Sequence, residues 1–272
     1  MKITLNLDTI GYKDKASAKR ATGAICNRTK SVKSIVNITP EQLINAIESG
    51  KTFTPGELSG TLENDWKSQQ IIAADIDNDK ALLDDKGKPI KKNNKVVKGP
   101  CNHVIAPGEA LEILKANNLN PYFMYHSFSS TPELPKYRII FILSERLTDG
   151  AEAKQLTRKL ANLFNSATKE PNADTSISNL DRLLFGSAPG SVFYKSGEIT
   201  DKSKFDGLMD PGEDNKPKNT PTNERARGAW DKEKEEEQAR LTRDIEKETG
   251  GAIKRTVLLY TLAIGVGISL AL

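Results

Sequence analysis

Apolar residues recur along the chain with the two spacings that regular secondary structure requires. Alternation of polar and apolar residues is typical of strands, whereas apolar residues three and four positions apart are typical of helices. Short alternating or continuous apolar runs predict strands at residues 2–7, 70–74, 122–125, 137–143 and 192–194. Helical spacing predicts helices that begin close to residues 40, 107 and 151. The chain is therefore expected to combine strands and helices around a core.

The predicted helix near residue 40 has the most complete local start signal. Thr39 is suited to be its N-cap, and Gln42 completes the spacing of a capping box, in which each side chain binds the other residue's backbone amide. Pro40 fits the first helical turn, and Gly50 is suited to end the helix. We therefore expect a helix between Thr39 and Gly50.

Two regions depart from this pattern of core elements. Residues 80–98 contain seven lysines and a Lys-Gly-Lys-Pro turn, which predicts an exposed hairpin. After the predicted domain at 1–205, residues 206–228 are rich in Pro, Asn, Asp and Lys and are expected to be a flexible linker. Residues 229–250 are expected to be a highly charged helix, and 251–272 an apolar C-terminal tail.

The last sixteen residues, 257–272, carry no charge. A helix needs roughly twenty apolar residues to span a bilayer, so this stretch is slightly short. Two interpretations remain open: a marginal membrane tether, or an apolar helix that packs within a longer protein. The rest of the chain is hydrophilic, with a mean hydropathy of −0.51, which excludes a polytopic membrane protein.

Composition narrows the class of protein further. Lys and Arg number 40 against 36 Asp and Glu, a net charge of +4, and residues 231–250 alone carry −3, leaving +7 elsewhere. A modestly basic body is compatible with a polyanionic partner. Cys26 and Cys101 are too few for a disulfide-rich secreted scaffold, and no signal peptide opens the sequence. We therefore expect a cytoplasmic protein, with a C-terminal membrane tether as the alternative.

Two carboxylates follow the predicted strand at 70–74. Asp75 and Asp77 are two positions apart, so on an extended chain they project from the same face. Such close anions repel, and the pKa of one should rise unless a cation lies between them. Mg²⁺ and Mn²⁺ prefer carboxylate oxygen and fit this position. The alternative is a solvated loop, because Asp and Asn are common turn residues.

A third carboxylate would complete a metal site of the kind used in phosphoryl transfer. Asp174 and Asp181 both lie in a later acidic region, and either one can close a three-carboxylate site if its strand neighbours that of Asp75. Two metals in such a site stabilise the attacking and leaving oxygens. Lys136 and Arg138 alternate at the strand predicted for 137–143 and suit a triphosphate.

This ordered set resembles the three motifs of the archaeo-eukaryotic primase superfamily, over roughly residues 30–200. The strand ending in Asp-x-Asp is similar to Ile-Ile-Ala-Ala-Asp-Ile-Asp at 71–77. The hydrophobic-Asp motif is similar to Ala173-Asp174, followed by Asp-Arg-Leu-Leu-Phe-Gly at 181–186. The Ser-x-His motif is replaced by Lys-Tyr-Arg, so that Arg138 takes the histidine position. Phage-type members are similar in having a segment like Tyr-His-Ser-Phe-Ser, here residues 125–129, before a Tyr-Arg strand.

The resemblance implies an α+β fold, in which an RRM-like primase-polymerase core is joined to a smaller α/β subdomain with the active site between them. It implies a DNA primase or polymerase, a nucleotidyltransferase that makes primers or short strands on single-stranded DNA in plasmid or phage replication. The implied cofactor is Mg²⁺ or Mn²⁺ in a two-metal site, and the implied catalytic residues are Asp75, Asp77 and Asp174, with Asp181 as a further metal ligand. The implied nucleotide-binding residues are His126, Ser127, Ser129, Lys136, Arg138 and Arg182.

The implied partners are a single-stranded template, nucleoside triphosphates and a replicative helicase on a separate chain, because no Walker A sequence occurs here. The lysine-rich hairpin at 80–98 is a candidate for holding template backbone, although a solvated surface hairpin explains it equally well. The main rival function is a non-catalytic, nucleic-acid-binding replication initiator on the same scaffold. A second rival is a membrane-tethered protein in which the aspartates hold a structural ion.

Overall fold

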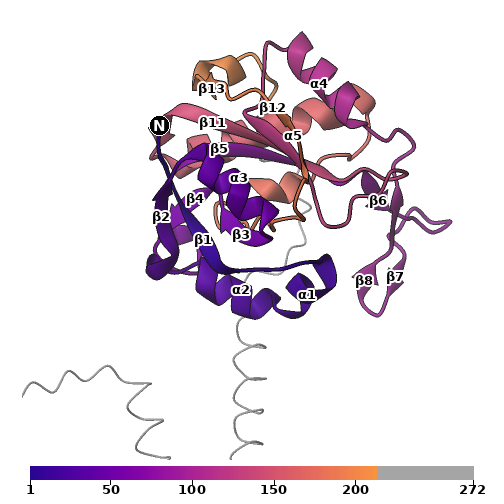
Figure 1. Cartoon of the computed structure of the whole chain (residues 1–272). Helices are drawn as coiled ribbons and strands as arrows, with labels where there is room; N and C mark the ends of the chain where they lie inside the picture. Colours follow the sequence, from indigo (N-terminus) through magenta and orange to yellow (C-terminus); the bar gives the residue numbers. More distant parts are fainter. Residues whose placement is uncertain (213–272) are drawn as a thin grey trace, which may run out of the picture. The chain divides into compact units, whose positions relative to one another are not determined.

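The computed structural model describes residues 1–212, which belong to one compact unit with bounds Met1–Asp214 (Figure 1). The expected charged helix at 229–250, the apolar tail at 251–272 and most of the expected linker lie outside the described residues. Within the described part, the buried Leu208 packs against the core, beyond the boundary expected at residue 205. No helix among residues 1–212 combines the length and the apolar character that crossing a membrane requires.

The central sheet has six strands in the order β12-β10-β11-β5-β4, with β13 added to β11. Only the β11–β13 pair is parallel among the pairs of this sheet in the described residues. Its strands are β4 Gly56–Leu58, β5 Trp66–Ile76, β10 Phe123–His126, β11 Tyr137–Leu147, β12 Val192–Lys195 and β13 Ile199–Thr200. A second, antiparallel sheet has the order β2-β1-β3. Its strands are β1 Ile3–Gly11, β2 Ile35–Ile38 and β3 Lys51–Thr54.

Five α-helices and four short 3₁₀ helices accompany these sheets in the described residues. The α-helices are α1 Lys15–Arg20, α2 Thr22–Thr29, α3 Pro40–Glu48, α4 Pro107–Ala116 and α5 Gly150–Thr168. The 3₁₀ helices are η1 Val32–Ser34, η2 Glu63–Asp65, η3 Thr175–Ser178 and η4 Lys202–Phe205. The central sheet lies between α4 and α5 on one side and α3 with the β1–β3 sheet on the other (Figure 1).

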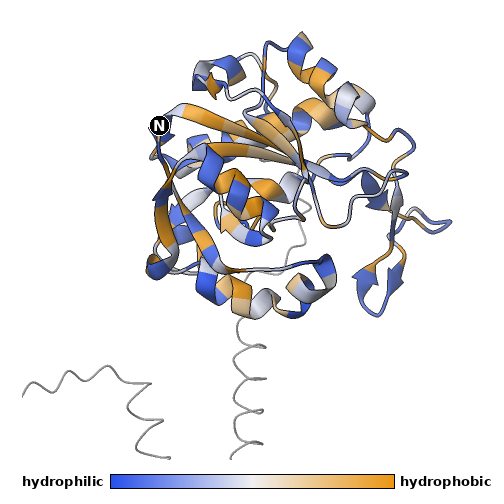
Figure 2. Ribbon diagram, viewed as in Figure 1, coloured by the Kyte–Doolittle hydropathy of each residue, from blue (hydrophilic) through white to orange (hydrophobic). Residues whose placement is uncertain are grey.

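Both faces of the central sheet are buried, and this explains the continuous apolar runs of its strands. On β5, Ile72, Ala74 and Ile76 belong to the core that includes α4 and α5. The intervening Ile71 and Ala73 belong to the opposite core, with residues of β1 and α3. Figure 2 shows the resulting concentration of hydrophobic residues along β5 and β11. Because side chains alternate along a strand, the face taken by each residue near the end of β5 follows directly.

The lysine-rich region predicted to be an exposed hairpin forms two small antiparallel ribbons. β6 Asp79–Ala81 pairs with β9 Lys98–Pro100, and β7 Lys91–Lys92 pairs with β8 Lys95–Val96. The β7–β8 ribbon projects from the body of the unit (Figure 1). Its residues are exposed, as the polar sequence predicts.

The strands and helices predicted from periodicity are present, and several are longer than predicted. The strand predicted at 70–74 extends over 66–76, and the strand predicted at 137–143 extends over 137–147. The capping box also forms: the amide of Thr39 donates to Gln42 Oε1 at 2.9 Å, and the amide of Gln42 donates to Thr39 Oγ1 at 3.3 Å. Helices α1 and α2 and strands β2, β3 and β4 were not predicted. The unit is a mixed α/β structure with predominantly antiparallel sheets, in agreement with an α+β class.

Candidate active site

Asp75 and Asp77 line one cavity of about 310 Å³ at the end of β5. Asp75 continues the series of Ile71 and Ala73, so it faces the side of the sheet that carries the β1–α1 region. The cavity is enclosed by β5, β11, helix α1, the loop after β10 and Phe185. The two carboxylates predicted to project together therefore do share one hollow.

Arg138 is the direct cross-strand neighbour of Asp75 in the antiparallel β5–β11 pair. Its Nε lies 3.2 Å from Asp75 Oδ1, and both side chains are 8 % exposed. Its Nη1 donates to the backbone oxygen of Phe185 at 2.6 Å and to the Tyr125 hydroxyl at 3.2 Å. The guanidinium also lies 5.6 Å from the centre of the Tyr125 ring. Arg138 lines the cavity, and its Nη atoms donate to Asp75, Tyr125 and Phe185, whereas its buried Nε has no hydrogen-bond partner among the described residues.

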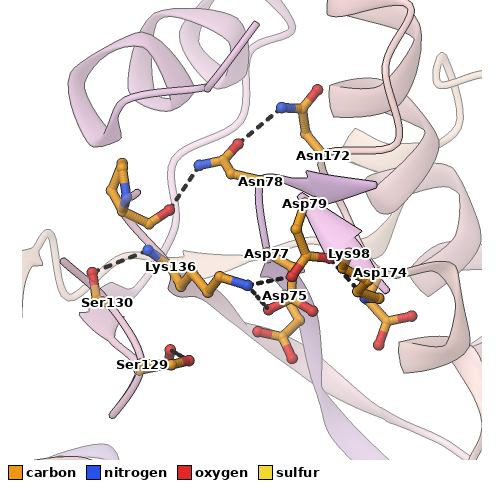
Figure 3. Close-up of polar contacts among 12 residues, drawn as sticks. Asp75, Asp77, Asn78, Asp79, Lys98, Ser129, Ser130, Lys136, Asn172 and Asp174 are labelled. Carbon is orange, nitrogen blue, oxygen red and sulfur yellow. Dashed lines mark hydrogen bonds and ion pairs between the residues drawn. The ribbon is translucent and has the colours of Figure 1, made fainter. Parts of the chain in front are cut away.

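The next two aspartates have opposite electrostatic surroundings. Burial, followed by the charge of Asp75, raises the pKa of Asp77, and Lys136 Nζ is 3.8 Å from its Oδ1. Asp79 accepts hydrogen bonds from Lys136 and, at 2.7 Å, from Lys98 (Figure 3). Burial alone would raise the pKa of Asp79, but these two lysines hold it below its ordinary value. Asp79 is therefore a paired structural acid, whereas Asp77 is short of positive charge, as functional acids often are.

The segment that carries Asp174 is held against the end of β5 by backbone hydrogen bonds. The amide of Asp174 donates to the backbone oxygen of Asp75 at 2.9 Å, and the amide of Asp77 donates to that of Asn172 at 2.9 Å. An isolated bridge joins Ile76 to Ala173. The sequence motif that follows Ala173 is thus brought beside the Asp-x-Asp motif, across nearly one hundred residues of chain.

The side chains of Asp174 and Asp181 have other partners. Asp174 Oδ2 accepts from Arg182 at 2.6 Å and from the Ser176 hydroxyl at 2.8 Å, and it caps η3. Asp181 forms an ion pair with Lys30 at 2.6 Å. No three acidic, histidine or cysteine side chains within residues 1–212 converge into a group able to hold a metal ion. Of the predicted set, Asp75 and Asp77 are the pair that share the cavity, and two carboxylates with a raised pKa at Asp77 fit one hard divalent cation.

The other residues predicted to bind the nucleotide lie in three different surroundings. Ser127 and Ser129 line the cavity of the aspartates, with their hydroxyls 3.2 Å apart. His126 lines a second cavity of about 700 Å³, which shares Ser127 and Phe128 with the first. Its Nδ1 lies 3.1 Å from the Ser130 hydroxyl, its ring packs 4.3 Å from that of Phe193, and burial lowers its pKa. Arg182 instead pairs with Asp174, and Lys136 with Asp79.

Helix α1 supplies residues to the cavity that sequence reasoning missed. The cavity is lined by Lys15, Ala18 and Lys19 of this helix and by Thr22, the first residue of α2. The helix has six residues, of which Ala18 is buried, so it shows no apolar periodicity. The available signal was the N-cap: Asp14 accepts a hydrogen bond from the amide of Ser17 at 2.7 Å, a pattern typical of a helix start.

Comparison with known proteins gives one distant similarity. No protein-family model matches the chain, and no curated protein matches it. Among solved structures, the AEP domain of the cyanophage S-2L primase-polymerase is similar to this chain, with 11 % sequence identity and a TM-score of 0.37. The match covers 76 % of this chain and 88 % of that one. A similarity at this level assigns no residue role to this chain.

Proposed function

We propose that the domain is a metal-dependent nucleotidyltransferase of the primase-polymerase type, which synthesises primers or short strands on single-stranded DNA. One observation carries this proposal: Asp75 and Asp77 line the same cavity as the cationic side chains of Lys15, Lys19 and Arg138. Carboxylates that bind a divalent cation, next to cations that bind phosphate, are what phosphoryl transfer requires of a protein. The resemblance of the three sequence motifs to those of primase-polymerases supports the same choice, including an RRM-like core.

In this proposal each residue has a physical task. Asp75 and Asp77 hold the cation, and Arg138 fixes the orientation of Asp75 through its ion pair at 3.2 Å. Ser127 and Ser129 offer hydroxyl donors on the cavity wall. A bound Mg²⁺ or Mn²⁺ would supply neutralisation of the charge that develops on the reacting phosphate. Asp174 suits a third ligand better than Asp181, because its backbone is already bonded to that of Asp75, but it must first release Arg182.

A second function, nucleic-acid binding without catalysis, is favoured by a specific observation. Three of the four predicted carboxylates form a close ion pair with a protein cation: Asp75 with Arg138, Asp174 with Arg182 and Asp181 with Lys30. An acidic site whose charges are balanced by the protein has less need of a metal. The two functions share a fold and a DNA ligand but differ in whether nucleotide is incorporated.

Incorporation of nucleotides separates the two functions. The full chain is incubated with single-stranded DNA, with or without a primer, and labelled nucleotides in Mg²⁺ or Mn²⁺. We expect metal-dependent products that fall by about 100-fold or more in Asp77→Asn, the scale of losing a key electrostatic group. Asp206→Asn is the matched control, because Asp206 is exposed and distant in sequence from every motif. DNA binding with no incorporation under any of these conditions would establish the non-catalytic function instead.

A further inference from the structure

We propose that Lys15 and Lys19 of helix α1 form the binding site for the phosphate groups of the incoming nucleotide. This rests on the proposed function, since it takes the ligand to be a nucleoside triphosphate. It moves the phosphate-binding role away from the strand residues Lys136 and Arg138, which the sequence motifs indicate, to a short helix outside those motifs.

The cations on the strand side are already engaged. Arg138 is buried against Asp75 and also donates to Tyr125 and Phe185. Lys136 is 11 % exposed and is held by Asp79 and Asp77. A phosphate that drew either side chain away from its present position would break a buried ion pair, which leaves a carboxylate without its partner.

The two lysines of α1, in contrast, are not held in ion pairs within the described residues. Lys15 and Lys19 are one helical turn apart, so their side chains leave the same face of α1, and both line the cavity. Within residues 1–212, no carboxylate forms an ion pair with either ammonium group. Partial burial and the nearby charges of Lys136 and Arg138 lower the pKa of Lys15, against a smaller opposing effect of Asp77. An anion bound beside Lys15 would offset the nearby positive charges of Lys136 and Arg138.

The composition of the cavity fits a phosphate chain. Its charged lining residues are three cations, Lys15, Lys19 and Arg138, against the two carboxylates, so a net positive charge remains before any metal binds. Ser127 and Ser129 add hydroxyl donors to the same lining. The volume of about 310 Å³ lies at the lower end of small-molecule sites, which span roughly 300–1,000 Å³.

The neighbouring cavity indicates how the bound nucleotide would be oriented. It shares Ser127 and Phe128 with the first cavity but is lined largely by uncharged residues, with several prolines and His126. A nucleoside needs such a mixed apolar and polar surface, whereas its phosphates need cations. The phosphates therefore point toward α1 and the nucleoside toward the second cavity.

The test measures equilibrium binding of dATP, deoxyadenosine and inorganic tripolyphosphate to the full chain. We expect Lys15→Ala/Lys19→Ala to weaken dATP and tripolyphosphate binding by roughly 10-fold or more, the effect of losing a charge-assisted hydrogen bond, and to leave deoxyadenosine binding unchanged. Lys15→Arg/Lys19→Arg should restore most of the affinity. Lys33→Ala/Lys67→Ala is the matched control, because these lysines are exposed and do not line the cavity.

Each result bears on the phosphate site or on the proposed function separately. Equal binding of dATP by the wild type and by Lys15→Ala/Lys19→Ala overturns the phosphate site, even if the protein incorporates nucleotides. A wild type that binds neither dATP nor tripolyphosphate also overturns the phosphate site. A double variant that loses only the binding of single-stranded oligonucleotide overturns it as well, because the lysines would then bind backbone phosphates of DNA. Loss of tripolyphosphate binding in the double variant, in a protein that never incorporates nucleotide, supports the phosphate site and overturns the proposed function.

Discussion

The side-chain amide of Asn172 donates a 2.9 Å hydrogen bond to Oδ1 of Asn78, 94 positions earlier in the chain (Figure 3). Asn78 is fully buried and has a positive φ of 54°, in the left-handed region that asparagine tolerates better than most residues. Its side chain also exchanges hydrogen bonds with the backbone of Ile105 and donates to the backbone oxygen of Pro135 at 2.7 Å. This one side chain therefore joins the turn after Asp77 to three other segments.

Replacing Asn78 by alanine should destabilise the domain strongly. Asn78→Ala leaves the buried amide of Ile105 and a donor of Asn172 without partners, and each such group costs about 1–3 kcal/mol. We expect the free energy of unfolding to fall by about 2–5 kcal/mol in urea titrations. Asn118→Ala is the control, because Asn118 has a φ of 56° but is exposed, so only the backbone cost of about 1 kcal/mol should remain. Similar losses in both variants would contradict a role for the buried network.

The long central strands could be predicted from the sequence, whereas the partners of their charged residues could not. β5 and β11 are buried on both faces, so each has a continuous apolar run that can be recognised in the single sequence. The position of Asp75 and Arg138 on these strands follows from that run. Their pairing depends on the register between the strands, which no spacing along the chain determines.

The N-terminal side of the site was not predictable for a different reason. Helix α1 buries Ala18, and α2 buries Ile25 and Thr29, so neither shows the apolar stripe that marks a helix in the sequence. Strands β2 and β4 are four and three residues long, too short for a clear alternation. Only the tertiary structure therefore shows that Lys15 and Lys19 lie at the site, and a motif search centred on the aspartates overlooks them.

Arg138 should prove to be mainly a positioning and structural residue. Arg138→Met removes the cation that faces the buried Asp75, and breaking a buried ion pair costs about 3–5 kcal/mol. We expect a loss of stability in that range, measured by urea unfolding. Combining it with Asp75→Asn should recover part of the loss, because no uncompensated carboxylate then remains. If Arg138→Met is as stable as the wild type while nucleotide binding is lost, Arg138 is instead a direct ligand of phosphate.

The stability of the domain should fall in mild acid, in part because of His126. Burial lowers the pKa of His126 in the folded state, so the unfolded chain binds a proton more readily. The contribution is fully present above the ordinary histidine pKa of about 6.5 and is lost as the pH falls below it. We expect the free energy of unfolding of His126→Gln to vary less between pH 7.5 and pH 5 than that of the wild type, although Gln lacks the ring contact with Phe193. His103→Gln is the control, and an equal pH dependence in His126→Gln and the wild type would remove His126 as a cause.

The lysines of the β7–β8 ribbon should govern the salt dependence of DNA binding if this ribbon holds the template backbone. Lys91, Lys92 and Lys95 are exposed on a projecting ribbon, where phosphate can reach all three. Replacing all three by alanine should weaken single-stranded DNA binding and reduce the slope of log K against log salt by about 2, since each phosphate contact on a single strand contributes roughly 0.7. Nucleotide binding in the aspartate cavity should not change. The triple variant Lys33→Ala/Lys67→Ala/Lys115→Ala removes the same charge from exposed sites on other elements. An equal reduction of the slope in both triple variants would show that net charge, and not this ribbon, attracts the DNA.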